Sequence, residues 1–174
     1  MLIILSGLPG VGKTTIAREI VWTMVATHVR VDAIEQALRR AGIDVRHEGY
    51  RAAYAVAEDN LRLGQIVVAD SVNPWAVTRD EWRAVAQRAG VPRLDVEVVC
   101  SDLDEHRRRI EMRKPDSPDQ KLPTWQQVLA REYHPWDRER LVIDTALLTV
   151  EQAARAILAE VPSGPTFRGR RGML

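Results

Sequence analysis

The residues best suited to chemistry lie near the amino terminus, in the run Gly7, Leu8, Pro9, Gly10, Val11, Gly12, Lys13, Thr14, Thr15. This run contains the pattern Gly-x-x-x-x-Gly-Lys-Thr, whose glycines allow backbone N–H groups to point inward around a polyphosphate. Lys13 can reach the outer phosphates, and the hydroxyl of Thr14 can bind Mg²⁺. A turn that binds nothing would need neither the lysine nor the threonine. The run is therefore predicted to bind the phosphates of a nucleotide together with Mg²⁺.

The sequence on either side of this loop favours the same interpretation. Four apolar residues, Leu2 to Leu5, predict a buried strand before it. After it, apolar residues at helical spacing predict a helix from Lys13 to Thr27. Such a helix would direct its positive amino-terminal end at the same anion.

Two carboxylates follow predicted strands. Asp32 follows the run His28–Val31, and Asp70 closes the apolar run that begins at Gln65. In a phosphoryl transfer Asp32 would accept the proton of the attacking hydroxyl; alternatively, it only caps the next helix. Asp70 would hold Mg²⁺ directly or through water; alternatively, it serves only in the turn that follows.

A strongly basic helix is predicted to begin at Asp102, and a proline-rich segment follows it. Arg109 and Arg113 share one face of this helix because they are four residues apart. We interpret residues 107–131 as a lid that closes Arg109 and Arg113 onto the phosphates, with Arg131 as a further candidate. The alternative is a solvated face whose arginines pair with acidic residues of the same helix.

The acceptor of a transferred group would lie between residues 32–54 and the loop after Asp70. The candidates for contact with this substrate are Asp32, Tyr50, Tyr54, Asn73 and Arg79. Three aromatic residues near the lid, Trp125, Tyr133 and Trp136, either pack on a nucleotide or belong to the core, and their helical spacing favours the core.

Strand and helix patterns alternate along the chain. Strands are predicted at 2–5, 28–31, 65–70, 94–100 and 141–144. Helices are predicted at 13–27, 32–40 and 50–64, and further helices begin at the patterns Thr78-x-x-Glu81, Asp102-x-x-Glu105, Thr124-x-x-Gln127 and Thr149-x-x-Gln152. This alternation predicts a three-layer α/β fold, with a five-stranded, mostly parallel sheet and helices on both faces. Ligands of such folds bind at the carboxyl ends of the strands.

Composition sets limits on the function. The chain has 174 residues, which predicts one domain over 1–161 and a flexible basic tail over 162–174. Without the tail, 22 basic residues face 24 acidic ones, which argues against nucleic-acid binding. No apolar run approaches the ~20 residues that cross a membrane, and we expect a cytoplasmic protein. The single cysteine, Cys100, is interpreted as a buried core thiol.

The pattern as a whole resembles the small phosphate-loop kinases, over about residues 2–161. The residues that carry the resemblance are the amino-terminal loop, Asp32, Asp70 and the arginine-rich lid helix. This fold family includes shikimate, gluconate and adenylylsulfate kinases, and the chain is most similar to the chloramphenicol phosphotransferase and zeta-toxin branch, often labelled an AAA-type ATP-binding domain. The resemblance implies a nucleoside-monophosphate-kinase-like sheet, ATP as donor and Mg²⁺ as cofactor. It also implies that Asp32 is the base and that Arg109 and Arg113 bind ATP.

These observations predict an ATP-dependent phosphotransferase that moves the γ-phosphoryl group to a hydroxyl of a small molecule. One alternative is a nucleotide-dependent ATPase or switch that acts with a protein partner. Another is a kinase of nucleic-acid 5′ ends. An Asn-Lys-x-Asp element, which would read guanine, is absent from the sequence. The sequence identifies neither the acceptor nor the oligomeric state.

Overall fold

The computed structural model describes residues 1–115 and 120–162. Residues 163–174, nearly all of the predicted tail, and residues 116–119 of the predicted lid lie outside the described residues. The strands are β1 (Leu2–Ser6), β2 (Ala26–Arg30), β3 (Ile66–Asp70), β4 (Arg93–Val99) and β5 (Leu141–Asp144). The helices are α1 (Lys13–Thr23), α2 (Val31–Arg40), α3 (Glu48–Arg62), α4 (Ala76–Ala89), α5 (Leu103–Met112), α6 (Trp125–Leu129) and α7 (Val150–Ala159).

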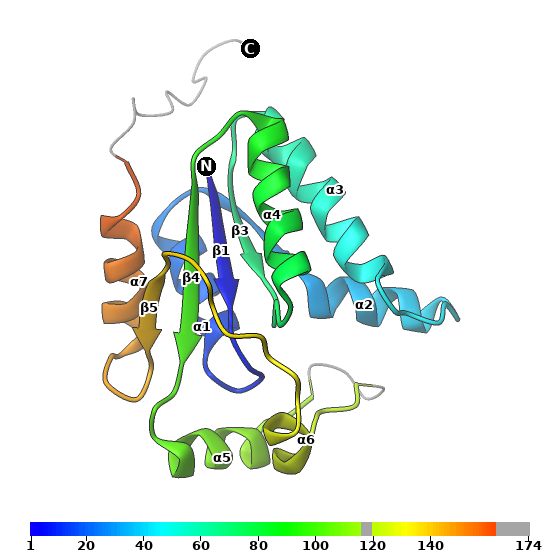
Figure 1. Cartoon of the computed structure of the whole chain (residues 1–174), viewed down its shortest axis with the longest axis vertical. Coiled ribbons are helices and arrows are strands. Elements are labelled where there is room, and N and C mark those ends of the chain that lie inside the picture. Colours follow the sequence, from blue (N-terminus) through cyan, green and yellow to red (C-terminus); the bar gives the residue numbers. More distant parts are fainter. Residues whose placement is uncertain (116–119, 163–174) are drawn as a thin grey trace, which may run out of the picture.

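The five strands form one parallel sheet in the order β2-β3-β1-β4-β5 (Figure 1). This confirms the predicted α/β class, and the sheet is parallel throughout. Helices α1 and α7 pack on one face of the sheet, and α3 and α4 pack on the other.

The central strand β1 shows why the sheet needs helices on both sides. All five of its residues are buried. Ile3 and Leu5 join the apolar cluster under α1 and α7, whereas Leu2 and Ile4 join the cluster under α3 and α4. Successive side chains of a strand point to opposite faces, so an unbroken apolar run has to be covered twice.

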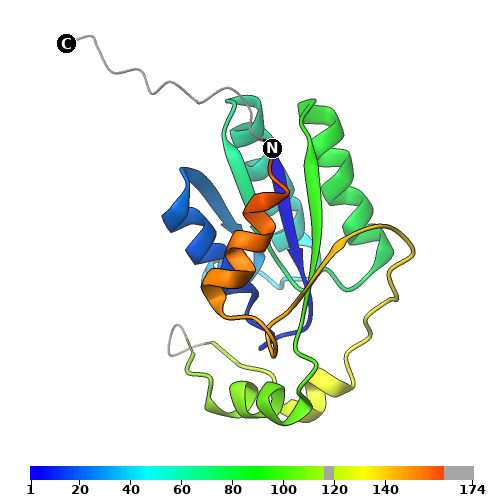
Figure 2. The same cartoon turned by 90° about the vertical axis from the view of Figure 1, so that its left-hand side faces the viewer.

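Helices α5 and α6 lie across the carboxyl ends of the strands (Figures 1 and 2). They follow β4 and precede β5 in the chain. The predicted lid therefore stands at the edge of the sheet where the strand-end rule places a ligand.

The first helix is shorter than predicted. It ends at Thr23 rather than Thr27, and residues 26–30 instead form the edge strand β2. Ala26 pairs with Ile66, and Arg30 pairs with Asp70, in register with β3. Pairing with a buried strand overrides the local helical period here. The strand ends at Arg30, so Asp32 lies in the first turn of α2.

The predicted helix starts have mixed outcomes. The capping boxes at Thr124 and Thr149 are confirmed, and the side chain of Asp102 caps α5. The box at Thr78 is wrong, because α4 begins at Ala76 and the hydroxyl of Thr78 donates to the carbonyl of Trp75 instead.

Cys100 is buried, as predicted, with 7% of its surface exposed. Within the described ranges, none of the helices has the length and apolar character needed to span a bilayer.

Candidate active site

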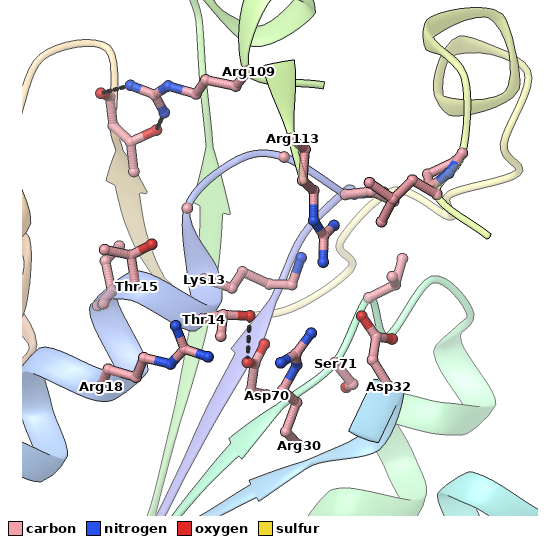
Figure 3. A pocket seen from close by; sticks show the side chains of 18 of the residues that line it. Lys13, Thr14, Thr15, Arg18, Arg30, Asp32, Asp70, Ser71, Arg109 and Arg113 are labelled. Atoms are coloured by element: carbon pink, nitrogen blue, oxygen red, sulfur yellow. Dashed lines mark hydrogen bonds between the residues drawn. The ribbon is translucent and has the colours of Figure 1, made fainter. Parts of the chain in front are cut away.

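A cavity of about 940 Å³ opens at the carboxyl ends of the strands. The amino-terminal loop, α2, the segments around α5 and the loop after β5 enclose it (Figure 3). Among the described residues, ten Lys or Arg side chains and four Asp or Glu side chains line it. This excess of positive charge suits an anionic ligand that carries several charges.

The conformation of the amino-terminal loop requires its glycines. At Gly7 the φ angle is 145°, and an added Cβ would lie 2.2 Å from the carbonyl oxygen of Val98. At Gly10 the φ angle is 85°, and a Cβ would lie 2.5 Å from Cδ1 of Ile110 in α5. The loop is thus packed closely against β4 and α5: a side chain at Gly7 would overlap the backbone of β4, and one at Gly10 would have to displace the side chain of Ile110.

The start of α1 has the features of an anion-binding helix terminus. Gly12 precedes the helix in a left-handed conformation and supplies no side-chain cap. The first turn contains no acidic residue. The first N–H groups of a helix have no partner within the helix and carry partial positive charge, so they favour a bound phosphate.

Lys13 lies at the centre of this loop. Its side chain is buried, and Nζ donates hydrogen bonds to the carbonyl oxygens of Gly7 (2.8 Å) and Leu8 (2.9 Å). Burial lowers the pKa of the ammonium group, although the charges of Asp70 and Asp32 oppose the effect. A phosphate bound in the loop would supply the negative charge that the buried ammonium lacks.

The hydroxyl of Thr14 donates a 2.7 Å hydrogen bond to Oδ2 of Asp70 (Figure 3). Oδ2 also lies 3.3 Å from Nε2 of His28. Burial of Asp70 by itself would raise its pKa, but the His28 contact, the charge of Lys13 and the Thr14 hydrogen bond outweigh burial and hold the pKa low. A hydroxyl beside an ionised carboxylate is the kind of oxygen pair that Mg²⁺ prefers, so the pair fits this ion.

Asp32 faces the same cavity from α2 (Figure 3). The expectation that it caps its helix is wrong, because Arg30 occupies the cap position and no side-chain cap is formed. Glu35, one turn later, also lines the cavity, and burial raises its pKa despite a hydrogen bond from Arg39. Asp32 lies instead in the first turn of α2, where its charge interacts favourably with the amino-terminal end of the helix, and its side chain lines the cavity.

The two lid arginines behave differently. The guanidinium of Arg113 extends into the cavity toward Lys13 (Figure 3), and its charge, like that of Arg131, acts to lower the pKa of Lys13. Arg109 also lines the cavity, but its Nε donates to Glu105 and its two terminal nitrogens donate to Oγ1 (2.8 Å) and the carbonyl oxygen (3.1 Å) of Thr145. The guanidinium of Arg113 is therefore directed into the cavity, whereas that of Arg109 is bonded to Glu105 and Thr145 at the edge of the cavity.

Sequence reasoning missed Thr145, which lines the cavity. Its Oγ1 lies 2.9 Å from the carbonyl oxygen of Val11 and 3.1 Å from that of Val99. The residue directly follows β5. The strand-end rule that selected Asp32 and Asp70 applies equally here and would have found it.

Four predicted substrate residues, Tyr50, Tyr54, Asn73 and Arg79, do not line the cavity. The hydroxyl of Tyr50 accepts a hydrogen bond from the backbone of Asn73, and the Asn73 amide donates to Ser6. The hydroxyl of Tyr54 donates to the carbonyl of Thr78. Tyr50, Tyr54 and Asn73 thus form hydrogen bonds in and around the loop after β3 instead of lining the cavity.

Arg79 is only 1% exposed and has a structural role. Its guanidinium donates to the carbonyl oxygens of Asn73, Pro74, His134 and Pro135. It also packs over the rings of Tyr133 and Trp136. Arg79 thereby joins the loop after β3 to the segment before β5, and Tyr133 and Trp136 pack here rather than in the cavity.

Comparisons with known proteins agree with this architecture. A family model described as "AAA domain" matches residues 2–135. The APS kinase CysC of Mycobacterium tuberculosis, solved with AMPPNP and APS, is 19% identical with a TM-score of 0.71, and the match covers 91% of this chain and 95% of that one.

Two further solved structures have the same fold. Kti12 of Chaetomium thermophilum, solved with ADP-AlF3, is 21% identical with a TM-score of 0.66, covering 91% of this chain and 96% of that one. A gluconokinase of Sinorhizobium meliloti is 17% identical with a TM-score of 0.60, covering 90% and 89%. In the search of curated proteins, nothing matches this chain significantly.

Proposed function

The chain belongs to the AAA domain family and has the fold of phosphate-loop kinases, and we propose that it transfers the γ-phosphoryl group of ATP to a hydroxyl group of a small molecule. The observation that carries the proposal is the position of Asp32. It lines the same cavity as Lys13 and Thr14 and is not used to cap its own helix. A carboxylate in this position can accept a proton from a hydroxyl group bound in the same cavity.

The donor side of the site consists of the loop Gly7–Thr15. Its N–H groups and Lys13 would bind the β- and γ-phosphates, once Nζ leaves the carbonyls of Gly7 and Leu8. Thr14 and Asp70 would hold Mg²⁺, which supplies charge neutralisation on the phosphates.

On the acceptor side, Asp32 would take the proton of the attacking hydroxyl while the hydroxyl oxygen of the acceptor forms a bond to the γ-phosphorus. The bond between that phosphorus and the bridging oxygen breaks, and ADP leaves with the electron pair. Arg113 and Arg131 would stabilise the charge on the transferring group, since both line the cavity together with Lys13 and Asp32. Positioning and electrostatics account for most of the rate in such transfers.

The test is ADP release by the purified chain with Mg²⁺ and ATP, alone and with a panel of hydroxylated metabolites. Acceptor-dependent release, with a product heavier by one phosphoryl group, supports the proposal. Release that depends on a protein partner instead supports a nucleotide-dependent switch, and phosphorylation of an oligonucleotide 5′ end supports a nucleic-acid kinase. Absence of any nucleotide binding in calorimetry overturns all three.

A further inference from the structure

We propose that His106 and Thr145 are positioning residues of the phosphate-binding loop, which orient its peptide groups from outside the site. The inference rests on the proposed function, because it concerns how the loop meets a phosphate. Its basis is that two loop carbonyls, those of Pro9 and Val11, accept hydrogen bonds from elements 97 and 134 residues further along the chain.

The first contact comes from α5. Nε2 of His106 lies 2.8 Å from the carbonyl oxygen of Pro9. A carbonyl only accepts hydrogen bonds, so Nε2 carries the hydrogen and donates it. The imidazole is 4% exposed, and Trp125 of α6 packs edge-on against it with ring centroids 5.1 Å apart. The ring is thus held in place from the lid side.

The second contact comes from the loop after β5. Arg109 donates to Oγ1 of Thr145, so the hydroxyl hydrogen of Thr145 is left to be donated. Two carbonyl oxygens lie within reach, those of Val11 and Val99. The Val99 carbonyl already accepts the backbone N–H of Thr145 at 2.9 Å. The Val11 carbonyl oxygen is also the nearer of the two, at 2.9 Å against 3.1 Å, so we assign the hydroxyl hydrogen to it.

Peptide geometry explains how these two contacts orient the hydrogen-bond donors of the loop. In a trans peptide the C=O of one residue and the N–H of the next point in opposite directions. Holding the carbonyls of Pro9 and Val11 toward α5 and the loop after β5 therefore turns the N–H groups of Gly10 and Gly12 to the opposite side. These are the donors that a polyphosphate requires. Glycines rotate freely, so without these contacts the two amides would have to be ordered when the ligand binds.

The experiment measures binding of inorganic pyrophosphate by calorimetry, together with the melting temperature of each variant. His106→Leu and Thr145→Val remove one donor each, whereas His106→Gln and Thr145→Ser keep a donor at a similar position. We expect the first pair to bind pyrophosphate about tenfold more weakly, the effect of about one hydrogen bond. Arg107→Gln is the matched control, because Arg107 is on the same helix, pairs with Glu111 and does not line the cavity.

The glutamine variant separates positioning from packing. His106→Gln loses the ring contact with Trp125 and should melt at a lower temperature than the unmodified protein, yet it should recover most of the pyrophosphate affinity. The inference is overturned if folded His106→Leu and Thr145→Val bind pyrophosphate normally, or if neither conservative variant restores binding. Failure of the unmodified chain to bind pyrophosphate would instead contradict the proposed function itself.

Discussion

The hydroxyl of Thr14 donates its hydrogen to the carboxylate of Asp70 at 2.7 Å, across 56 residues of sequence. Thr14 is the second residue of α1 and Asp70 ends β3, and β3 lies beside β1 in the sheet. The parallel register brings the two strand ends level, with Leu5 opposite Asp70. The contact therefore follows directly from the strand order.

Removing the Thr14 hydroxyl should weaken magnesium-dependent nucleotide binding. Thr14→Val leaves the buried carboxylate of Asp70 without one of its donors and removes one of the two oxygens that would hold Mg²⁺. We expect ATP affinity in the presence of Mg²⁺ to fall by about tenfold or more, with little change when EDTA is present. Calorimetry with and without Mg²⁺ measures this, and Thr14→Ser should retain binding. Equal affinities of the Val and Ser variants would contradict the assignment.

Nucleotide affinity should fall at alkaline pH, because Lys13 then loses its proton. Burial lowers the pKa of Lys13 in the free protein, and a bound polyphosphate would raise it. The complex therefore binds a proton more tightly than the free protein does, so affinity falls as pH rises through the lowered pKa. Titrations with ADP at increasing pH should show this loss below the ordinary lysine range. Lys13→Met should bind weakly, and its affinity should not vary with pH in that range.

Asp32→Asn should separate binding from transfer. The amide cannot take a proton from an acceptor hydroxyl. The substitution leaves unchanged the phosphate loop and the two residues assigned to Mg²⁺, Thr14 and Asp70. We expect ATP affinity to change little and acceptor-dependent ADP release to fall by about 10²-fold or more. Glu35→Gln, one turn along the same helix, is the comparison, with a smaller expected effect on turnover. Normal transfer by Asp32→Asn would show that another group is the base.

Gly7→Ala should destabilise the fold more than Gly42→Ala. Both positions have positive φ, so both substitutions carry backbone strain. Only at Gly7 would the new Cβ meet a backbone atom, the carbonyl oxygen of Val98, while nothing lies within 4 Å at Gly42. We expect an additional loss of about 1–3 kcal/mol in the free energy of unfolding, measured with urea. Equal losses would mean that β4 moves aside.

Arg79→Met should reduce stability without changing acceptor affinity. The substitution leaves four backbone carbonyls without a charged donor, so the free energy of unfolding should fall by at least about 2 kcal/mol. Arg88→Met removes an exposed pair with Glu58 and should cost less than about 1 kcal/mol. If Arg79→Met raised the KM for the acceptor and left stability unchanged, Arg79 would have to be assigned to the substrate site instead.

The sequence predicted the parts of this protein that depend on local pattern. The strand, loop and helix around Lys13 follow from an apolar run, three glycines and a helical period, and the fold class follows from their alternation with later elements. The predicted bounds of the edge strand β2 were wrong because its pairing with β3 depends on residues 40 positions away, as in Ala26 with Ile66.

The site was predicted less completely for the same reason. Asp32 and Asp70 were selected because each follows a predicted strand, and both line the cavity. The burial of Arg79 depends on carbonyls about 55 residues distant, and no local pattern reports such a contact. The sequence analysis did not select His106, because its partner is the carbonyl of Pro9, 97 residues earlier in the chain.

The Thr145 hydroxyl connects three segments that are far apart in the sequence. Its oxygen accepts a hydrogen bond from Arg109 of α5, and the carbonyl oxygens of Val11, in the amino-terminal loop, and of Val99, at the end of β4, lie within reach of its hydrogen. A displacement of any one of these segments therefore alters the hydrogen bonds available to the other two.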